Sequence, residues 1–159
     1  MTNQPNPQFI FALFELSRLI RLHADHKARP LGITRAQWAV LAKLERTEGL
    51  KQSELADLLE MQPITLTRLI DRLCDNGLIE RRSDASDRRA KRLYLMPAAR
   101  PLLNQLALLR GEITTTALAG LDAAEAERLV AQLETIKDNV RNAIQAGSGD
   151  HDVRESGHG

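Results

Sequence analysis

The segment from residue 52 to residue 95 constrains the fold most, because its hydrophobic pattern changes from helical to extended within a few residues. Apolar side chains at positions 66, 69, 70 and 73 share one face of a helix expected over about 63–76, with Pro63 at its start and Gly77 just past its end. A shorter helix is expected over about 52–59, before the turn EMQP. The stretches LIERR and KRLYL then indicate two strands joined by the polar loop SDASDRRA. Two helices, a tight turn and a basic hairpin together predict a winged helix-turn-helix.

The rest of the chain shows helical spacing of apolar residues over about 9–29, 34–47, 98–119 and 123–146. The winged lobe already has its own core, so we expect the long apolar stripes of the flanking helices to pack against a second copy; packing on the lobe is the alternative. The predicted fold class is therefore mainly α (α+β): a winged helix-turn-helix with a small β-hairpin wing, flanked by long N- and C-terminal dimerisation helices.

The expected organisation has five parts. They are a disordered N-terminus at 1–8, a dimerisation helix at 9–33, the winged lobe at 34–96, dimerisation helices at 97–146 and a disordered tail at 147–159. The start of the lobe carries a strong signal. Thr34 and Gln37 have the spacing of a capping box, and Ile33 and Trp38 have the spacing of a hydrophobic staple.

Composition limits the classes of protein to which the chain can belong. Its 159 residues carry a net charge of +1, with 43% hydrophobic and 27% charged residues, as in soluble globular proteins. One cysteine cannot form an internal disulfide, and neither a signal peptide nor an apolar run of about 18 residues is found, so we expect a cytoplasmic protein without a membrane span. No nucleophile–base pair, glycine-rich phosphate loop or catalytic carboxylate pair is present, so we expect no enzyme activity and no cofactor.

The cations of this near-neutral chain gather in the predicted hairpin. Residues 81–92 contain six of them against two acids: Arg81, Arg82, Arg88, Arg89, Lys91 and Arg92, against Asp84 and Asp87. A basic hairpin can follow the DNA backbone and insert an arginine into a narrow minor groove. Either Arg88 or Arg89 could be the residue that enters the groove. Asp84 and Asp87 are placed to hydrogen-bond neighbouring arginines and fix their direction.

The helix expected over 63–76 carries side chains suited to the major groove. Because its apolar face is committed to the core, polar residues remain for the other faces: Gln62, Thr65, Thr67, Arg68, Asp71 and Arg72. Glutamine and threonine can hydrogen-bond base edges, and arginine can bind guanine or phosphate. Gln52 and Ser53 begin the preceding helix, where backbone N–H groups suit a phosphate. These residues predict sequence-specific binding to double-stranded DNA.

The segment LKQSELADLLEMQPITLTRLIDRLCDNGLIERRSDASDRRAKRLYL resembles the DNA-binding core of MarR-type bacterial transcriptional regulators, and D-x-x-D-R-R is the most specific short motif of that family. The stretches RPLGITRAQWAVL and SDRRAKRLYL are similar to the SlyA-type subgroup. The resemblance covers about residues 9–146. It implies a homodimer on a pseudo-palindromic operator, with Arg68 as the recognition-helix arginine, Arg88 and Arg89 as the wing arginines and Asp87 as the supporting acid.

The resemblance also implies a small-molecule effector. In this family small aromatic acids or phenolic compounds often bind between the dimerisation helices and the winged lobe and weaken DNA binding, as expected of a ligand-released repressor. The matching positions of the SlyA-type subgroup are Arg18, Arg21 and Trp38. Alternatively, the two arginines form ion pairs with Glu15, Asp25 or an acid of a second copy, and the staple alone explains Trp38.

Other interpretations stay open at this point. Arg72 could pair with an acid on its own helix. The lobe could be a protein-interaction module whose basic wing faces an acidic partner. Cys74 could be a redox sensor, although a buried inert thiol is favoured, because sensor cysteines are exposed and have a lowered pKa. His23 and His26 lie three residues apart but lack a nearby cysteine or acidic cluster, so no metal site is expected.

Overall fold

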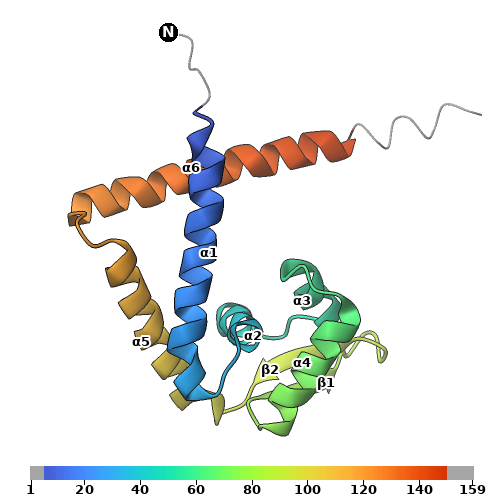
Figure 1. The fold of residues 1–159 in the computed structure, drawn as a ribbon. Helices are drawn as coiled ribbons and strands as arrows, with labels where there is room; N and C mark the ends of the chain where they lie inside the picture. The colour runs from blue at the N-terminus through green and yellow to red at the C-terminus, as the bar shows by residue number, and fades with distance from the viewer. Residues whose placement is uncertain (1–5, 150–159) are drawn as a thin grey trace, which may run out of the picture. The chain divides into compact units, whose positions relative to one another are not determined.

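The computed structural model describes residues 6–149, which form mainly helices (Figure 1). The elements in order are α1 (Gln8–Ala28), the 3-10 turn η1 (Arg29–Leu31), α2 (Arg35–Arg46), α3 (Gln52–Leu58), α4 (Pro63–Asp75), β1 (Ile79–Ser83), β2 (Lys91–Leu95), α5 (Ala99–Ala117) and α6 (Ala123–Gly149). β1 and β2 pair as an antiparallel two-stranded sheet, with Arg81 opposite Leu93. The predicted fold class, a mainly helical winged helix-turn-helix with a small hairpin wing, is confirmed.

The chain divides after Ala117 into two compact units, the second containing α6. α5 therefore groups with α1 and the lobe, whereas the sequence pattern grouped it with the last helix. α6 also continues to Gly149, so residues 147–149 are helical and not part of a disordered tail, because a helix can continue without apolar side chains. Gln8 is likewise helical. Of the expected disordered termini, residues 1–5 and 150–159 lie outside the described residues.

The winged lobe contains an aliphatic core to which α2, α3, α4 and both strands contribute. Its fully buried residues are Val40, Leu41, Leu44, Leu55, Leu66, Ile70, Leu73, Leu93 and, nearly so, Ile79. The face of α4 predicted to be apolar is the face that the core covers, with Leu69 partly buried beside it. Burying a side chain of this size contributes about 2 kcal/mol of stabilising free energy, and this holds α4 in a fixed orientation against its neighbours.

The start of α2 is capped as the sequence predicts. The Thr34 hydroxyl accepts a hydrogen bond from the Gln37 N–H at 3.2 Å, and the Gln37 side chain accepts one from the Thr34 N–H at 3.0 Å. Ile33 and Trp38, the two residues of the staple, are both buried. Gly77 follows α4 with a φ of +71°, a left-handed conformation that glycine adopts without strain. These local signals place α2 and α4 correctly from sequence alone.

A third backbone segment, residues 49–51, pairs with β2 of the wing, and the sequence pattern did not reveal it. The Gly49 N–H donates to the Leu93 carbonyl at 2.9 Å, and the Leu93 N–H donates to the Leu50 carbonyl at 3.0 Å. Lys51 also forms a β-bridge with Arg92. Gly49 is needed here, since its φ is +78° and a Cβ at this position would lie 3.2 Å from the Tyr94 hydroxyl oxygen. The segment before α3 therefore ties the wing to the helices of the lobe.

Within the first unit, α1 and α5 lie side by side (Figure 1). An ion pair joins them, with Lys27 Nζ 3.0 Å from Glu112 Oε2. Both α1 and α6 nevertheless expose large apolar side chains: Phe9, Ile10, Phe11, Phe14, Leu16, Leu19 and Leu22 on α1, and Leu129, Val130, Leu133 and Val140 on α6. None of the helices within residues 6–149 is long and apolar enough to cross a membrane.

Candidate nucleic-acid interface

α4 presents a polar surface on the side away from the core. Gln62, Thr65, Arg68 and Arg72 are all exposed. A shallow hollow of about 230 Å³ is lined by Thr65, Arg68, Leu69 and Arg72. Within residues 6–149, the guanidinium groups of Arg68 and Arg72 form no hydrogen bond and no ion pair. The pairing of Arg72 with an acid of its own helix, considered from sequence, is therefore not found, and two cations remain available on this surface.

Arg81 of β1, in contrast to Arg68 and Arg72, forms hydrogen bonds with three residues of the lobe. Its Nε donates to Gln52 Oε1 at 3.1 Å, and its Nη2 donates to Asp71 Oδ1 at 2.6 Å and, more weakly, to the Thr67 carbonyl at 3.4 Å. Gln52 in turn donates through Nε2 to the Thr67 hydroxyl at 3.0 Å. One arginine thus links the wing, the start of α3 and the middle of α4.

This network changes what can be expected of Gln52 and Thr67, which the sequence assigned to DNA. Both ends of the Gln52 amide are bound within the lobe, and the Thr67 hydroxyl also donates to the Pro63 carbonyl at 2.9 Å. These polar groups position α4 against α3. Ser53, by contrast, is exposed at the first turn of α3.

Sequence reasoning missed Arg81 and Asp71 as a pair, but the strand pattern contains a signal. Arg81 follows Ile79 by two positions and lies opposite Leu93, so all three share one face of the hairpin. Ile79 and Leu93 are buried in the core. A charged residue on a core-facing position of a strand needs a partner within the protein. That requirement, rather than its charge, identifies Arg81 as structural.

The tip of the wing is a tight turn with two arginines at its centre. The Ala90 N–H donates to the Asp87 carbonyl at 3.1 Å, which makes Arg88 and Arg89 the two central residues of the turn. The Asp87 carboxylate accepts a hydrogen bond from the Arg89 backbone N–H at 3.0 Å. Asp87 therefore shapes the backbone, as aspartate often does at the first position of a turn. The expected bond from Asp87 to an arginine side chain is not formed within the described residues, and both guanidinium groups at the tip are exposed.

Asp84 anchors the base of the same loop and does bind an arginine, as predicted. The residue is 6% exposed, and its carboxylate accepts hydrogen bonds from the Ser86 N–H, the Ser86 hydroxyl and Arg92 Nε, each at 2.9 Å. Lys51 Nζ lies 3.9 Å away. The two Ser86 bonds, followed by the Arg92 guanidinium, lower the pKa of Asp84 to about 2. Arg92 also donates to the Gly49 carbonyl at 2.6 Å, so a charged pair fixes the wing to the segment before α3.

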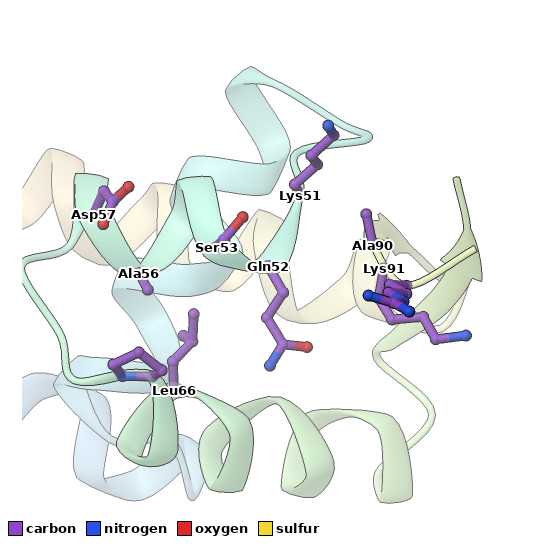
Figure 2. A pocket seen from close by; sticks show the side chains of 10 residues that line it. Lys51, Gln52, Ser53, Ala56, Asp57, Leu66, Ala90 and Lys91 are labelled. Carbon is purple, nitrogen blue, oxygen red and sulfur yellow. The ribbon is translucent and has the colours of Figure 1, made fainter. Parts of the chain in front are cut away.

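A cavity of about 360 Å³ lies between the start of α3, the first turn of α4 and residues 89–91 of the wing (Figure 2). In Figure 2 the Gln52 side chain points from α3 toward α4, in agreement with its bond to Thr67. Lys51, Arg89 and Lys91 contribute three cations to the lining, against the single carboxylate of Asp57. Arg89 and the first turn of α4 therefore border the same positively charged hollow.

The three residues predicted to bind an effector lie on α1 and α2. Arg18 forms an ion pair with Glu15, with Nη2 2.7 Å from Oε1, and Arg21 donates to the Ser17 hydroxyl at 2.8 Å. Glu15 raises the pKa of Arg18 through this hydrogen bond and through its charge. Trp38 is 9% exposed. None of the three lines the hollows described above, and the intrahelical ion pair considered for Arg18 is present.

Two other side chains considered for chemistry are constrained by burial. Cys74 is half-buried, and burial raises the pKa of its thiol above the usual value, which disfavours the reactive thiolate. A redox sensor requires the opposite shift. His23 Nε2 is buried without a hydrogen-bond partner among the described residues. No group of three or more metal-ligating side chains occurs in that part of the chain.

The fold and the sequence are both similar to known regulators. A sequence model of the MarR family matches residues 33–91. The crystal structure of the transcriptional regulator PA3341 is 33% identical, with a TM-score of 0.74, and the match covers 84% of this chain and 98% of that one. A MarR transcriptional regulator from Methanosarcina mazei Go1 is 27% identical, with a TM-score of 0.78 and coverages of 86% and 99%. A mutant MarR from E. coli complexed with operator DNA is 24% identical and shares the fold, with a TM-score of 0.70 and coverages of 82% and 94%.

Proposed function

Because the chain belongs to the MarR family of transcriptional regulators, we propose that it binds operator DNA through α4 and the wing. The observation that carries this proposal is the distribution of unpaired cations. Arg68 and Arg72 on α4 lack partners within the described residues, and Arg89 lines the same hollow as the first turn of α4. Unpaired cations beside a helix start match the phosphates and base edges of a duplex.

Each exposed residue has a role that follows from its place. α4 lies in the major groove, where Gln62, Thr65 and Arg68 contact base edges. Arg72, one turn further along α4, and Ser53, at the start of α3, contact phosphates. Gln52 and Thr67 act indirectly, since they hold α4 in position through Arg81.

The two wing arginines, Arg88 and Arg89, contact different parts of the DNA. Arg89 faces the hollow beside α4 and binds the DNA backbone. Arg88 is the other central residue of the turn and enters the minor groove, whose narrow stretches attract arginine. Asp87 fixes the turn that presents both side chains.

The exposed apolar faces of α1 and α6 support a homodimer. Large apolar side chains along each of the two helices mark surfaces that a partner covers. A symmetric dimer presents two copies of α4, which accounts for binding to a pseudo-palindromic operator. In sedimentation experiments the protein is expected to be a dimer at micromolar concentration, and a stable monomer would contradict this assembly.

An aromatic carboxylate or phenolic effector, as in the SlyA-type subgroup, would bind near Arg18, Arg21 and Trp38 and release the repressor from DNA. Guanidinium groups and an indole are side chains that suit such a ligand. Trp38 is the only tryptophan of the chain, so its fluorescence reports directly on this region. Titration with benzoate or phenol is expected to change the fluorescence of the wild type but not of an Arg18→Ala/Arg21→Ala variant. An unchanged signal in the wild type would contradict this effector site.

A mobility-shift assay with the DNA upstream of the protein's own gene tests the DNA-binding function. The wild type is expected to shift this fragment in the presence of excess unrelated DNA. Arg68→Ala is expected to bind more weakly by about 1–3 kcal/mol, because one base-edge contact is lost. If the wild type bound no DNA fragment even at low salt, the protein-interaction module would become the better interpretation.

A further inference from the structure

Ile64 is a feature of α4 that neither the core nor the cationic surface explains. Its side chain is 63% exposed, although isoleucine is among the residue types most often buried. The adjacent side chains of Gln62, Thr65 and Arg68 are polar and exposed, and Gln62 forms no capping bond with the helix. A large apolar group therefore stands within the polar surface proposed to face DNA.

The geometry of the helix directs Ile64 away from the core. Leu66, which is fully buried, follows two positions later, and two residues correspond to a rotation of about 200° around the helix axis. Ile64 therefore lies on the side opposite Leu66. Arg68 follows Ile64 by one turn, so the two side chains are neighbours on the outer surface of α4.

Helix stability does not account for this residue. Isoleucine loses side-chain freedom in a helix, and first-turn positions favour acidic groups that interact with the helix dipole. Single exposed apolar side chains are common on protein surfaces. This one, however, lies in the first turn of the recognition helix, which is the part that contacts base edges in helix-turn-helix proteins.

The major-groove edge of a base pair carries one apolar group, the C5 methyl of thymine. We infer that Ile64 packs against a thymine methyl and specifies an A·T pair in each half-site, beside the base pair that Arg68 contacts. The contact rests on the proposed function and adds to it a specificity-determining residue. Arg68 and Arg72, without acidic partners in residues 6–149, make the surroundings of Ile64 cationic, which fits DNA better than an apolar protein surface.

The contact can be tested by removing either of its partners, the thymine methyl group or the Ile64 side chain. The probe is the duplex that the wild-type protein recovers from a randomised DNA pool, with each thymine replaced singly by deoxyuridine, which lacks the C5 methyl. At one thymine per half-site the wild type is expected to bind about fourfold more weakly, since burying one methyl group contributes about 0.8 kcal/mol. Ile64→Ala is expected to bind the thymine and deoxyuridine duplexes equally.

Leu58→Ala provides the matched control, because Leu58 is an exposed apolar residue of α3, at 54% exposure. This variant is expected to keep the discrimination of the wild type. Equal binding of both duplexes by the wild type at every thymine, or unchanged discrimination in Ile64→Ala, would overturn the Ile64 contact and leave the regulator function intact. Failure of the wild type to enrich any sequence would instead overturn the proposed function, and the contact with it.

Discussion

Two arginines of the wing, Arg81 and Arg89, differ in what holds them. Arg81 lies on the core-facing side of β1 and donates hydrogen bonds to Gln52, Thr67 and Asp71. Arg89 lies at the tip, and its guanidinium has no partner within the described residues. The sequence presents both as members of one basic cluster. The difference shows that a cation's partners, and not its presence in the cluster, separate residues that build the lobe from residues free to bind DNA.

The largest expected effect concerns the unpaired arginines. Replacing Arg88 and Arg89 together by alanine is expected to weaken operator binding by about 1–3 kcal/mol per lost contact. The free energy of unfolding is expected to change by less than about 0.5 kcal/mol, because exposed side chains without partners contribute little to stability. Fluorescence anisotropy with labelled operator and urea unfolding measure the two quantities. A large loss of stability would mean that these arginines are structural after all.

The paired arginine is expected to behave in the reverse way. Arg81→Ala removes hydrogen bonds to a carboxylate and an amide, and we expect the free energy of unfolding to fall by about 2 kcal/mol. This value allows for the solvent exposure of Asp71, which weakens its ion pair with Arg81. Arg82→Ala is the matched control, since Arg82 is exposed, pairs with Glu80 and stacks on Tyr94 at 4.1 Å. It is expected to cost less than about 1 kcal/mol. Equal losses in the two variants would contradict the special position of Arg81.

A smaller effect is expected for a polar contact that involves no charge. Thr34→Ala removes the hydroxyl that accepts the Gln37 N–H and is expected to lower the free energy of unfolding by about 1 kcal/mol. Thr47→Ala, at the other end of α2, removes a hydroxyl with no described role in capping and is the control. Thermal unfolding of both variants makes the comparison. No difference between them would remove the cap as a determinant of α2.

A pH-dependent effect is expected for Asp84, because Asp84→Asn removes the charge but keeps an oxygen that can accept the Ser86 bonds. The pKa of Asp84 is lowered to about 2, below the value of about 3.9 in an unfolded chain. Its charge therefore stabilises the folded state above about pH 4, and this stabilisation is lost as the pH falls through about 2. The stability difference between wild type and variant is expected to be constant above pH 4 and to shrink toward pH 2. A difference that stayed unchanged in acid would rule out a stabilising carboxylate.

The elements and the core were predictable because they depend on local patterns. Spacing of leucines placed α4, and the Thr34–Gln37 box placed the start of α2, since caps and amphipathic stripes are set within a few residues. The pairing of residues 49–51 with β2 was not predictable. It depends on Gly49 meeting Leu93, a pairing between distant segments that leaves no period in the sequence.

The candidate site was predictable in type but not in its division of roles. Arg68, Arg88 and Arg89 are exposed as expected of DNA contacts. Gln52 and Thr67 have the same chemical character, yet their bonds within the lobe follow from the position of Arg81 in three dimensions. Residue type indicates what a side chain can bind, whereas the fold decides what it does bind.

The salt dependence of operator binding tests the central distinction most directly, using Arg89→Gln and Arg81→Gln, which each remove one positive charge. Each phosphate contact contributes about 0.9 to the slope of log affinity against log salt concentration. Arg89→Gln is expected to lower the slope by about that amount, since we propose that Arg89 binds phosphate. Arg81→Gln is expected to leave the slope unchanged, because Arg81 is bound to Asp71 and not to DNA. Equal slopes in the two variants would contradict the distinction between Arg81, which stabilises the lobe, and Arg89, which is proposed to bind DNA.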